Sequence, residues 1–332
     1  MTRVVVIGGG QNSEHDVSLA SAAGMSAALR RRGFTVDEIT IGRDGCWSHA
    51  SESLGQTQAR SMQAALGLIA GADAVLPAVH GPRGEDGALA ALAELAGVAV
   101  VGSQLGAGAL AMDKWATKLV AEAVGIRTAR GRLIGRGDAG DVEYDGPVVV
   151  KPVAAGSSHG VSLVTDAAQL RDAIDQAAGF SDRILIEEVV RGREIDVAVL
   201  QEAGGMRWAA PPLEIHVADE ALFDERAKYD GSARFTTPAQ LTRGDGVALT
   251  TAATRMFDAL GCAGVARIDF FLTSDGPVLN EVNTMPGMTE YSQVPRMFAA
   301  AGVEYDELVE RLVASALERD SASSLTGRFL SE

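Results

Sequence analysis

ARIDFFLTSDGPVLNEVNTMPG, residues 266–287, contains two apolar-rich stretches separated by the turn sequence TSDGP. We expect a hairpin of two antiparallel strands in which Thr273 pairs with Pro277. The same register places Asp269 directly opposite Glu281. Like charges facing each other destabilise a strand pair, and burial increases the penalty, so a cation between the two carboxylates would resolve the repulsion.

Arg267 and Asn283 face each other on the same side of this hairpin, next to the two acids. Two carboxylates and an amide oxygen suit Mg²⁺, which prefers oxygen ligands and keeps coordination sites for substrate phosphates. A solvated polar face is the alternative interpretation, because such faces are common on antiparallel sheets. The pattern alone leaves both interpretations open.

A second segment, PVVVKPVAAGSSHGVSLV at residues 147–164, predicts two strands joined by a glycine- and serine-rich turn at 156–160. Backbone N–H groups at such a tip can bind phosphate oxygens, and Lys151 adds a positive charge at its base. A simple connection is the alternative, because glycine and serine favour turns in any hairpin. No Gly-Lys dipeptide occurs, which excludes a Walker A loop.

The composition is that of a globular protein, with 332 residues of which 47% are hydrophobic and 22% charged. This length predicts two or three domains and a cleft between them. The net charge of -15 argues against a nucleic-acid partner. Only four residues are lysines, so each one invites a functional explanation: Lys114, Lys118, Lys151 and Lys228.

Cys46 and Cys262 lie far apart and form no CxxC spacing, which predicts neither a disulfide framework nor a zinc site and suits the cytoplasm. The longest uncharged window, residues 95–112, is interrupted by glycines and is too weakly apolar to span a bilayer. The start of the chain suits a buried strand better than a signal peptide. We therefore expect no membrane partner.

The N-terminal third alternates short apolar runs with longer segments typical of helices, which predicts an α/β fold with a parallel sheet. The expected strands are 4–9, 34–41 and 74–79, and the expected helices are about 14–32 and 58–70. Ligands of such sheets bind beyond the carboxyl ends of the strands. The sequences GGGQNS and HGPRGEDG fall there.

The rest of the chain predicts two α+β regions. The first has a helix carrying MDKWATKLVAEAVG, strands at 130–134, 147–152, 161–164 and 184–190, and a helix at 166–178. The second has strands at 194–200 and 207–215, an irregular polar stretch at 219–238, helices at 246–260 and 304–319, and the hairpin described above. The tail 321–332 is expected to be partly disordered.

Several segments, in their order and spacing, resemble the ATP-grasp superfamily and, within it, the D-alanine:D-alanine ligase family. They are VKPVAAGSSHG, IEEVVRGRE, ARIDFF, NEVNTMPGMT, GGGQNSEHDVSL, HGPRGEDG and MDKWATK. The resemblance covers the chain except its tail. It implies a three-domain ATP-grasp fold, with an N-terminal parallel-sheet domain (1–103), a central domain (104–188) and a C-terminal domain (189–332), the last two enclosing ATP.

The implied reaction activates one D-alanine with ATP and lets the amine of a second D-alanine attack the acyl phosphate. The products would be D-alanyl-D-alanine, ADP and phosphate, for peptidoglycan synthesis and hence cell-wall biogenesis and cell shape. The resemblance also implies two Mg²⁺ ions, with Mn²⁺ as a substitute, and a homodimer in the cytoplasm.

Matching the family motifs position by position implies three sets of site residues. The expected nucleotide contacts are Lys114, Lys151, Ser158, Glu187, Glu188, Val190 and Glu194. The expected metal ligands are Asp269, Glu281 and Asn283. The expected catalytic residues are Glu14, Ser157, Arg267, Gly287 and Tyr229, and the expected substrate-binding residues are His80, Ser292 and Lys228.

The resemblance implies a role for each substrate-side residue. Glu14 would pair with the ammonium of the first D-alanine, near His80, and Ser157 would hydrogen-bond toward Glu14. Ser292 would bind the carboxylate of the second substrate. Arg267 and the Gly287 N–H would stabilise the oxyanion, whose donors each contribute about 10²- to 10³-fold to the rate. Taken singly, His80 also suits a core histidine and Glu14 a helix-start acid.

The polar loop at 225–238 is interpreted as a lid that excludes water and brings Lys228 to the transferred phosphate. The alternative interpretation of this segment is a disordered surface loop. Tyr229 in the loop accompanies dipeptide formation in the family, whereas relatives making D-alanyl-D-lactate depart from the Lys-Tyr pair.

Two positions depart from the family pattern. Ala154 and Ala155 stand where charged residues are frequent, which would weaken docking of the lid. Glu290 and Tyr291 stand where smaller or neutral residues are usual, beside Ser292. A carboxylate pointing into the acceptor pocket would repel an amino acid, so either Glu290 turns outward or the acceptor is another compound, such as D-serine or D-lactate. A nucleotide-binding sensor without ligase activity is a further alternative.

Overall fold

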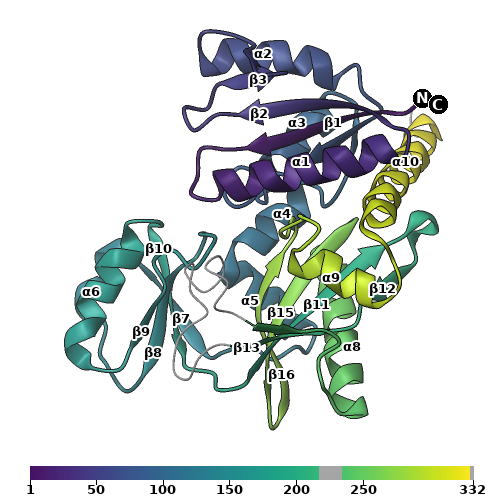
Figure 1. Cartoon of the computed structure of the whole chain (residues 1–332). Coiled ribbons are helices and arrows are strands. Elements are labelled where there is room, and N and C mark those ends of the chain that lie inside the picture. The colour runs from purple at the N-terminus through teal and green to yellow at the C-terminus, as the bar shows by residue number, and fades with distance from the viewer. Residues whose placement is uncertain (217–233, 330–332) are drawn as a thin grey trace.

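Three β-sheets follow one another along the part of the chain that the computed structural model describes, residues 1–216 and 234–329 (Figure 1). Helices join the sheet of the N-terminal third to the sheet of the C-terminal third, and the smallest sheet stands apart from both. Lys228 and Tyr229 lie outside the described residues. So does most of the expected lid.

The N-terminal sheet has a parallel centre, as the apolar runs predict. In spatial order its strands are β4 (Glu52–Ser53), β3 (Trp47–His49), β2 (Thr35–Ile41), β1 (Arg3–Gly9), β5 (Ala74–Pro77) and β6 (Ala99–Val100). β1 runs parallel to β2 and β5, and β5 runs parallel to β6. The edge strands β3 and β4 are antiparallel additions that the sequence pattern did not predict.

Helices cover both faces of this sheet, which explains why its central strand is fully buried. They are α1 (His15–Arg31), α2 (Gln58–Ile69) and α3 (Ala88–Leu95). Val4, Val5 and Val6 of β1 have no exposed surface, because alternate side chains enter two different cores.

The middle sheet is small and entirely antiparallel, in the spatial order β7 (Gly131–Gly135), β10 (Arg183–Glu188), β8 (Val148–Pro152), β9 (Ser162–Val164). A 3-10 helix, η1 (Arg136–Asp141), follows β7. Helix α6 (Ala167–Ala178) covers one face and shares a core with Val150, Ile184 and Ile186. Val149 and Lys151, which alternate with Val150 along β8, line the opposite face, in a cleft shared with residues of the C-terminal sheet.

The C-terminal sheet is also antiparallel. Its path is β14 (Arg234–Thr236), β13 (Leu213–His216), β11 (Arg193–Gln201), β15 (Val265–Thr273) and β16 (Gly276–Asn283), and β12 (Arg207–Ala209) also pairs with β11. A 3-10 turn, η2 (Ala203–Gly205), joins β11 to β12.

Helices α4 (Leu105–Met112), α5 (Lys114–Ala123) and α8 (Arg243–Leu260) share one core with this sheet. The helices α4 and α5 therefore pack with the C-terminal third, although the expected domain limits assign them to the central domain. Those limits stay a prediction.

Three expectations about this region need correction. The segment 207–215 forms two strands, β12 and β13, because Pro211 and Pro212 have no N–H to donate to the sheet. The last part of the expected irregular stretch is strand β14, which pairs with β13. The final helix, α10 (Tyr305–Phe329), continues past the expected end at 319 through most of the tail that we expected to be partly disordered.

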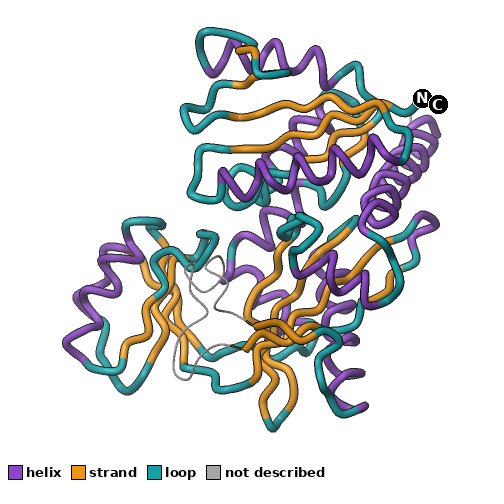
Figure 2. Tube along the Cα trace, in the orientation of Figure 1, coloured by secondary structure: helices purple, strands orange, loops and turns teal. Residues whose placement is uncertain are grey.

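Helix α10 joins the two larger sheets into one core, together with α9 (Gln293–Ala300) (Figure 2). Leu308 and Leu312 of α10 belong to the same buried cluster as Met25 and Leu29 of α1. Ion pairs from Arg31 to Asp306 and from Arg32 to Glu310 flank this contact.

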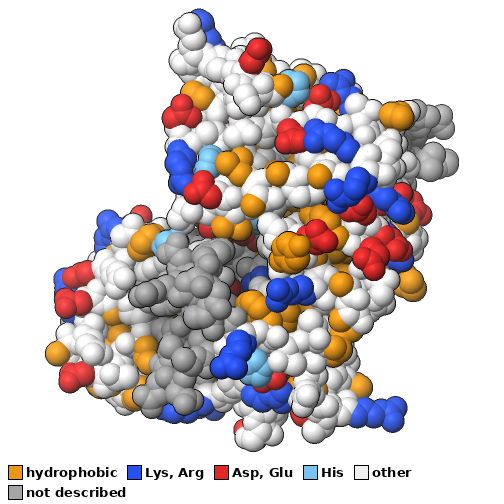
Figure 3. Space-filling view, in the orientation of Figure 1, with side chains coloured by type: hydrophobic (Ala, Val, Ile, Leu, Met, Phe, Trp, Pro, Cys, Tyr) orange, Lys and Arg blue, Asp and Glu red, His pale blue; other side chains and the backbone are white. Residues whose placement is uncertain are grey.

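Acidic and basic side chains are interspersed on the face shown in Figure 3. Within residues 1–216 and 234–329, no helix combines the length and the apolar character needed to span a bilayer.

Candidate active site

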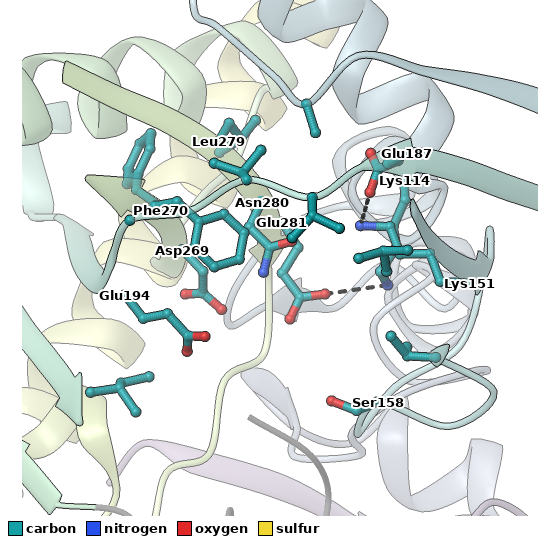
Figure 4. A pocket seen from close by; sticks show the side chains of 18 of the residues that line it. Lys114, Lys151, Ser158, Glu187, Glu194, Asp269, Phe270, Leu279, Asn280 and Glu281 are labelled. Carbon is teal, nitrogen blue, oxygen red and sulfur yellow. Dashed lines mark ion pairs between the residues drawn. The ribbon is translucent and has the colours of Figure 1, made fainter. Parts of the chain in front are cut away.

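A cleft of about 740 Å³ lies between the middle and C-terminal sheets, a volume typical of a cofactor pocket (Figure 4). Its walls come from β8, β10, β11, β15 and β16, from the start of α5 and from the tip of the β8–β9 hairpin. Every expected nucleotide contact lines it: Lys114, Lys151, Ser158, Glu187, Glu188, Val190 and Glu194. Arg267, Asp269 and Glu281 line it as well.

The β15–β16 hairpin pairs Asp269 with Glu281 and Arg267 with Asn283, as the sequence predicts. The predicted turn pairing is wrong, because Thr273 faces Gly276. An irregularity between residues 269 and 270 shifts the register by one residue and so compensates for this error at the acids.

Three carboxylates occupy one rung of the sheet. Asp196 on β11 pairs with Asp269, and Asp269 pairs with Glu281. Asp196 is 2% exposed, and its burial together with the charge of Asp269 raises its pKa well above the usual value. The sequence analysis missed Asp196, because placing it here requires the long-range pairing of β11 with β15.

Cations neutralise this row of acids. The Arg267 guanidinium donates two hydrogen bonds to Asp269, from Nε at 2.7 Å and from Nη2 at 2.8 Å. Lys114 Nζ lies 3.3 Å from Glu281 Oε2. Burial alone would lower the pKa of Arg267, but the carboxylates of Asp269 and Asp196 raise it above its usual value.

Asn283 completes a donor set that fits a hard cation. Its amide donates to Asp269 Oδ2 at 2.9 Å, which leaves its oxygen on the other side of the amide. Among the described residues, no group of three histidine, cysteine or acidic side chains is arranged to hold a metal ion. The fit to Mg²⁺ therefore rests on two acids, one amide oxygen and ligands supplied by the substrate.

Two buried lysines share one buried acid at the opposite wall. Lys118 Nζ pairs with one oxygen of Glu187 and also donates to the Ala129 carbonyl. Lys151 Nζ pairs with the other oxygen at 2.5 Å. Burial alone would raise the pKa of Glu187, but the two lysines lower it. The group keeps an excess positive charge, which suits an anion, and Lys118 had no role in the sequence analysis.

The hydrogen bond expected between Ser157 and Glu14 is present, with Ser157 Oγ donating to Glu14 Oε1 at 2.7 Å. Glu14 precedes α1 directly. Two glycines make room for its carboxylate, because a Cβ on Gly81 or Gly156 would lie 2.4 or 2.2 Å from Glu14 Oε2. Ser157 has a φ of 46°, a strained conformation of the kind that clusters at functional loops.

The loop that contains Gly287 is held mainly by the N-terminal third. His80 Nδ1 bonds the Met285 carbonyl at 2.8 Å, and Glu85 Oε1 accepts from the Met285 N–H at 3.2 Å. Ser21 Oγ accepts from Met288 N–H at 3.2 Å and bonds His80 Nε2 at 2.9 Å. Both ring nitrogens of His80 thus have protein partners.

Glu85 is a second acid that the sequence analysis missed, although it belongs to HGPRGEDG. Burial, and next the charge of Glu14, raise its pKa to about 7. Its other carboxylate oxygen accepts from the Gly81 N–H at 2.8 Å. Desolvation likewise lowers the pKa of His80.

Ser292 begins α9, and its Oγ accepts from the Thr289 N–H at 3.1 Å. A Cβ on Gly287 would lie 3.3 Å from this Oγ, so the two expected residues are neighbours. Glu290 and Tyr291 are exposed, Tyr291 by 77%. Burial, and next the negative charge of Glu290, raise the pKa of Tyr305 at the start of α10. Of the two alternatives, Glu290 turns outward.

Two family models match the chain. The model for the D-ala D-ala ligase N-terminus matches residues 3–103, and the model for the C-terminus matches residues 140–314. The chain belongs to the D-alanine:D-alanine ligase family. It is accordingly an ATP-dependent ligase.

Curated members of this family resemble the chain over nearly their full length. The D-alanine--D-alanine ligase A of Mesorhizobium japonicum is 38% identical, over 97% of this chain and 99% of its own. The D-alanine--D-alanine ligase of Streptomyces coelicolor is 37% identical, over 96% of this chain and 93% of its own.

Solved structures of D-alanine:D-alanine ligases show the same ATP-grasp fold. The ligase of Coxiella burnetii superposes with a TM-score of 0.81 at 28% identity, covering 98% of this chain and 97% of its own. The VanG D-Ala:D-Ser ligase of Enterococcus faecalis gives a TM-score of 0.79 at 27% identity, with coverages of 95% and 99%. A Bacillus anthracis D-alanine--D-alanine ligase complexed with ATP gives 0.79 at 26% identity, with coverages of 97% and 100%.

Proposed function

We propose that this ligase joins two D-alanines into D-alanyl-D-alanine through an acyl-phosphate intermediate and releases ADP and phosphate. The product would supply peptidoglycan synthesis, with the enzyme acting as a cytoplasmic homodimer. The hydrogen bond from Ser157 to Glu14 carries this proposal. It connects the hairpin of the nucleotide cleft to an acid that can hold the ammonium of a D-amino acid.

ATP is proposed to bind in the cleft between the two antiparallel sheets. Lys114 and Lys151 would contact its phosphates, since both line the cleft and pair there with acids that a polyanion can replace. Glu187, Glu188 and Val190 would surround the adenine, and Glu194 would bind the ribose. Ser158 would contribute at the hairpin tip.

Asp269, Glu281 and Asn283 are the proposed ligands of two Mg²⁺ ions, for which Mn²⁺ can substitute. Bound magnesium would neutralise phosphate charge and polarise the transferred phosphoryl group. The residues of the chain do the remaining work, since Arg267 lies beside the acids at 2.7 Å from Asp269 and can face a developing oxyanion.

The first D-alanine is proposed to lie between Glu14 and Arg267. Glu14 would pair with the ammonium of this D-alanine. His80 lies nearby, where burial lowers its pKa and the charge of Glu14 opposes this effect. The Gly287 N–H would join Arg267 in stabilising the tetrahedral intermediate. Hydrogen bonds to Met285 and Met288, on both sides of Gly287, hold this loop in place.

The second D-alanine is proposed to bind with its carboxylate at Ser292. Because Glu290 is exposed, no carboxylate of that residue faces the pocket, which supports a plain amino acid as the acceptor. Lys228 and Tyr229 keep the roles that the family motif implies. Lys228 would contact the transferred phosphate, and Tyr229 would join Ser157 and Glu14.

Incubation of the purified enzyme with ATP, Mg²⁺, D-alanine and competing D-serine or D-lactate tests the proposal. We expect D-alanyl-D-alanine as the main product, with one ADP per dipeptide. A mixed product in preference to the dipeptide would contradict the proposed acceptor. ATP binding without any D-alanine-dependent ADP release would contradict the ligase chemistry itself.

A further inference from the structure

Arg267 has two polar partners besides Asp269, and neither is an expected site residue. Its Nη1 donates to Gln293 Oε1 at 2.9 Å, and its Nε lies 3.3 Å from Asp196 Oδ2. Gln293 Nε2 donates to the same Asp196 oxygen at 2.9 Å. The three side chains therefore close a hydrogen-bonded triangle around the guanidinium.

The triangle draws on three separate elements. Asp196 comes from β11, Arg267 from β15 and Gln293 from the first turn of α9. The side chains of Arg267 and Asp196 are 14% and 3% exposed, so water competes little for these bonds. Burial of the Asp196 carboxylate opposite that of Asp269 destabilises the folded state, and the hydrogen bonds of Asp196 offset part of this destabilisation.

The contacts divide the guanidinium between two groups of residues. Asp269 takes Nε and Nη2, whereas Gln293 takes Nη1. Asp269 is also a proposed metal ligand, so its carboxylate would contact both Arg267 and the cation during the reaction. Gln293 is not a proposed metal ligand, and neither is Asp196, although Asp196 contacts Asp269 directly across the sheet.

We propose that Asp196 and Gln293 are positioning residues that, in addition to Asp269, fix the Arg267 guanidinium toward the reacting centre. This inference rests on the proposed function, in which Arg267 stabilises the oxyanion. Displacing such a donor by about 1 Å can lower a rate about 10²-fold. Gln293 directly follows Ser292, so the same helix start orders the proposed acceptor site and Arg267.

Steady-state kinetics of Gln293→Met, Asp196→Ala and the double variant test this inference. We expect each single variant to lower kcat by about 10- to 100-fold while KM for ATP changes less than about threefold. The double variant should lose little more than the worse single variant, because both act through Arg267. Asp196→Asn keeps an acceptor oxygen for Gln293 and Arg267, so it should retain most of the activity.

Gln201→Met is the matched control, because Gln201 is a buried glutamine at the other end of β11. Its kcat should equal that of the wild type. A kcat within twofold of wild type for Gln293→Met would overturn the inference, and so would a raised acceptor KM with unchanged kcat. Equal losses for Asp196→Asn and Asp196→Ala, or an increased Mg²⁺ requirement in Asp196→Asn, would also overturn it.

The wild-type product separates this test from the proposed function. If the wild type forms a product other than D-alanyl-D-alanine, the proposed acceptor is wrong, while the kcat comparison is made on that product. If the wild type forms dipeptide and the variants keep its kcat, only the positioning role fails.

Discussion

Ser157 donates its hydroxyl to a carboxylate oxygen of Glu14 at 2.7 Å, across 143 residues of sequence. The bond links the tip of the β8–β9 hairpin, which borders the cleft, to the start of α1, which packs on the N-terminal sheet. Under the proposed function, this bond would hold the substrate at Glu14 and the nucleotide in the cleft in a fixed relation, as phosphoryl transfer requires.

Ser157→Ala should lower kcat by about 10- to 100-fold, because Glu14 loses the donor that orients it. The free energy of unfolding should fall by only about 1 kcal/mol. Kinetics of dipeptide formation and chemical denaturation provide the two values. Ser162→Ala, which removes a half-buried hydroxyl that donates to Gln176 from β9 of the same hairpin, is the control and should leave kcat unchanged. A similar loss in both variants would refute the special role of Ser157.

Lys118→Met should raise KM for ATP and destabilise the fold. Glu187 would keep only Lys151 as its cation, so Lys151 would be less available to phosphate. Removal of one partner from a buried ion pair costs about 3–5 kcal/mol when the other charge is left alone, and Lys118→Met should cost less because Glu187 keeps Lys151. Calorimetric titration with ATP and urea denaturation measure both effects. The double variant Lys118→Met/Glu187→Gln should be less stable than Lys118→Met, because the buried Lys151 then loses its acid as well, and a recovery of stability would argue against this coupling.

The raised pKa of Glu85 predicts that stability falls as the pH rises. The folded state binds this proton up to about pH 7, whereas the unfolded state loses it near pH 4.5. Stability should therefore decline between those values by up to about 3 kcal/mol, and Glu85→Gln should remove this contribution. Glu14 and Arg267 also act on Glu85 and remain in the variant.

Urea denaturation between pH 4 and 8 gives the slope of unfolding free energy against pH for the wild type and for Glu85→Gln. The slopes are compared because the amide alters the hydrogen bonds to Gly81 and Met285 by an amount that does not depend on pH. Parallel curves for wild type and variant would contradict the assignment to Glu85.

Removal of divalent cations by chelation should abolish activity but shift Tm by less than about 2 °C. The acids at 269 and 281 are already paired with Arg267 and Lys114, so the fold does not depend on a metal. Activity assays and differential scanning fluorimetry before and after the addition of EDTA measure the rate and the Tm. A large fall in Tm would show that the acids depend on a cation for folding.

Glu290→Gln should not alter the choice of acceptor, because this carboxylate is exposed. Competition between D-alanine and D-serine should give the same product ratio as in the wild type. Ser292→Ala provides the contrast, since it should raise the KM of the second D-alanine about tenfold. A changed ratio in Glu290→Gln would place that side chain in the acceptor site after all.

Local patterns predicted the strands and helices that surround the cleft, and the motif spacing identified most of its side chains. The pairing of Asp269 with Glu281 was predicted correctly although the turn register was wrong, because a bulge compensated for the error. The pattern of a hairpin cannot show such a bulge.

Asp196 and Lys118 were missed because their partners lie on strands or helices distant in sequence. A signal did exist for Asp196. It follows Glu194 by two residues, so both acids fall on one face of an otherwise apolar strand. Lys118 is one of only four lysines, yet no local rule places it beside Glu187.

The shared core of α1, α9 and α10 also bears on how the cleft opens. Because that core is shared by the two larger sheets while the small sheet has a core of its own, opening of the cleft would move the small sheet against the other two. The two connections of the small sheet would form the hinge, namely residues 124–130 between α5 and β7 and residues 189–192 between β10 and β11. Each turnover would then break and remake the Ser157 contact as nucleotide enters and leaves.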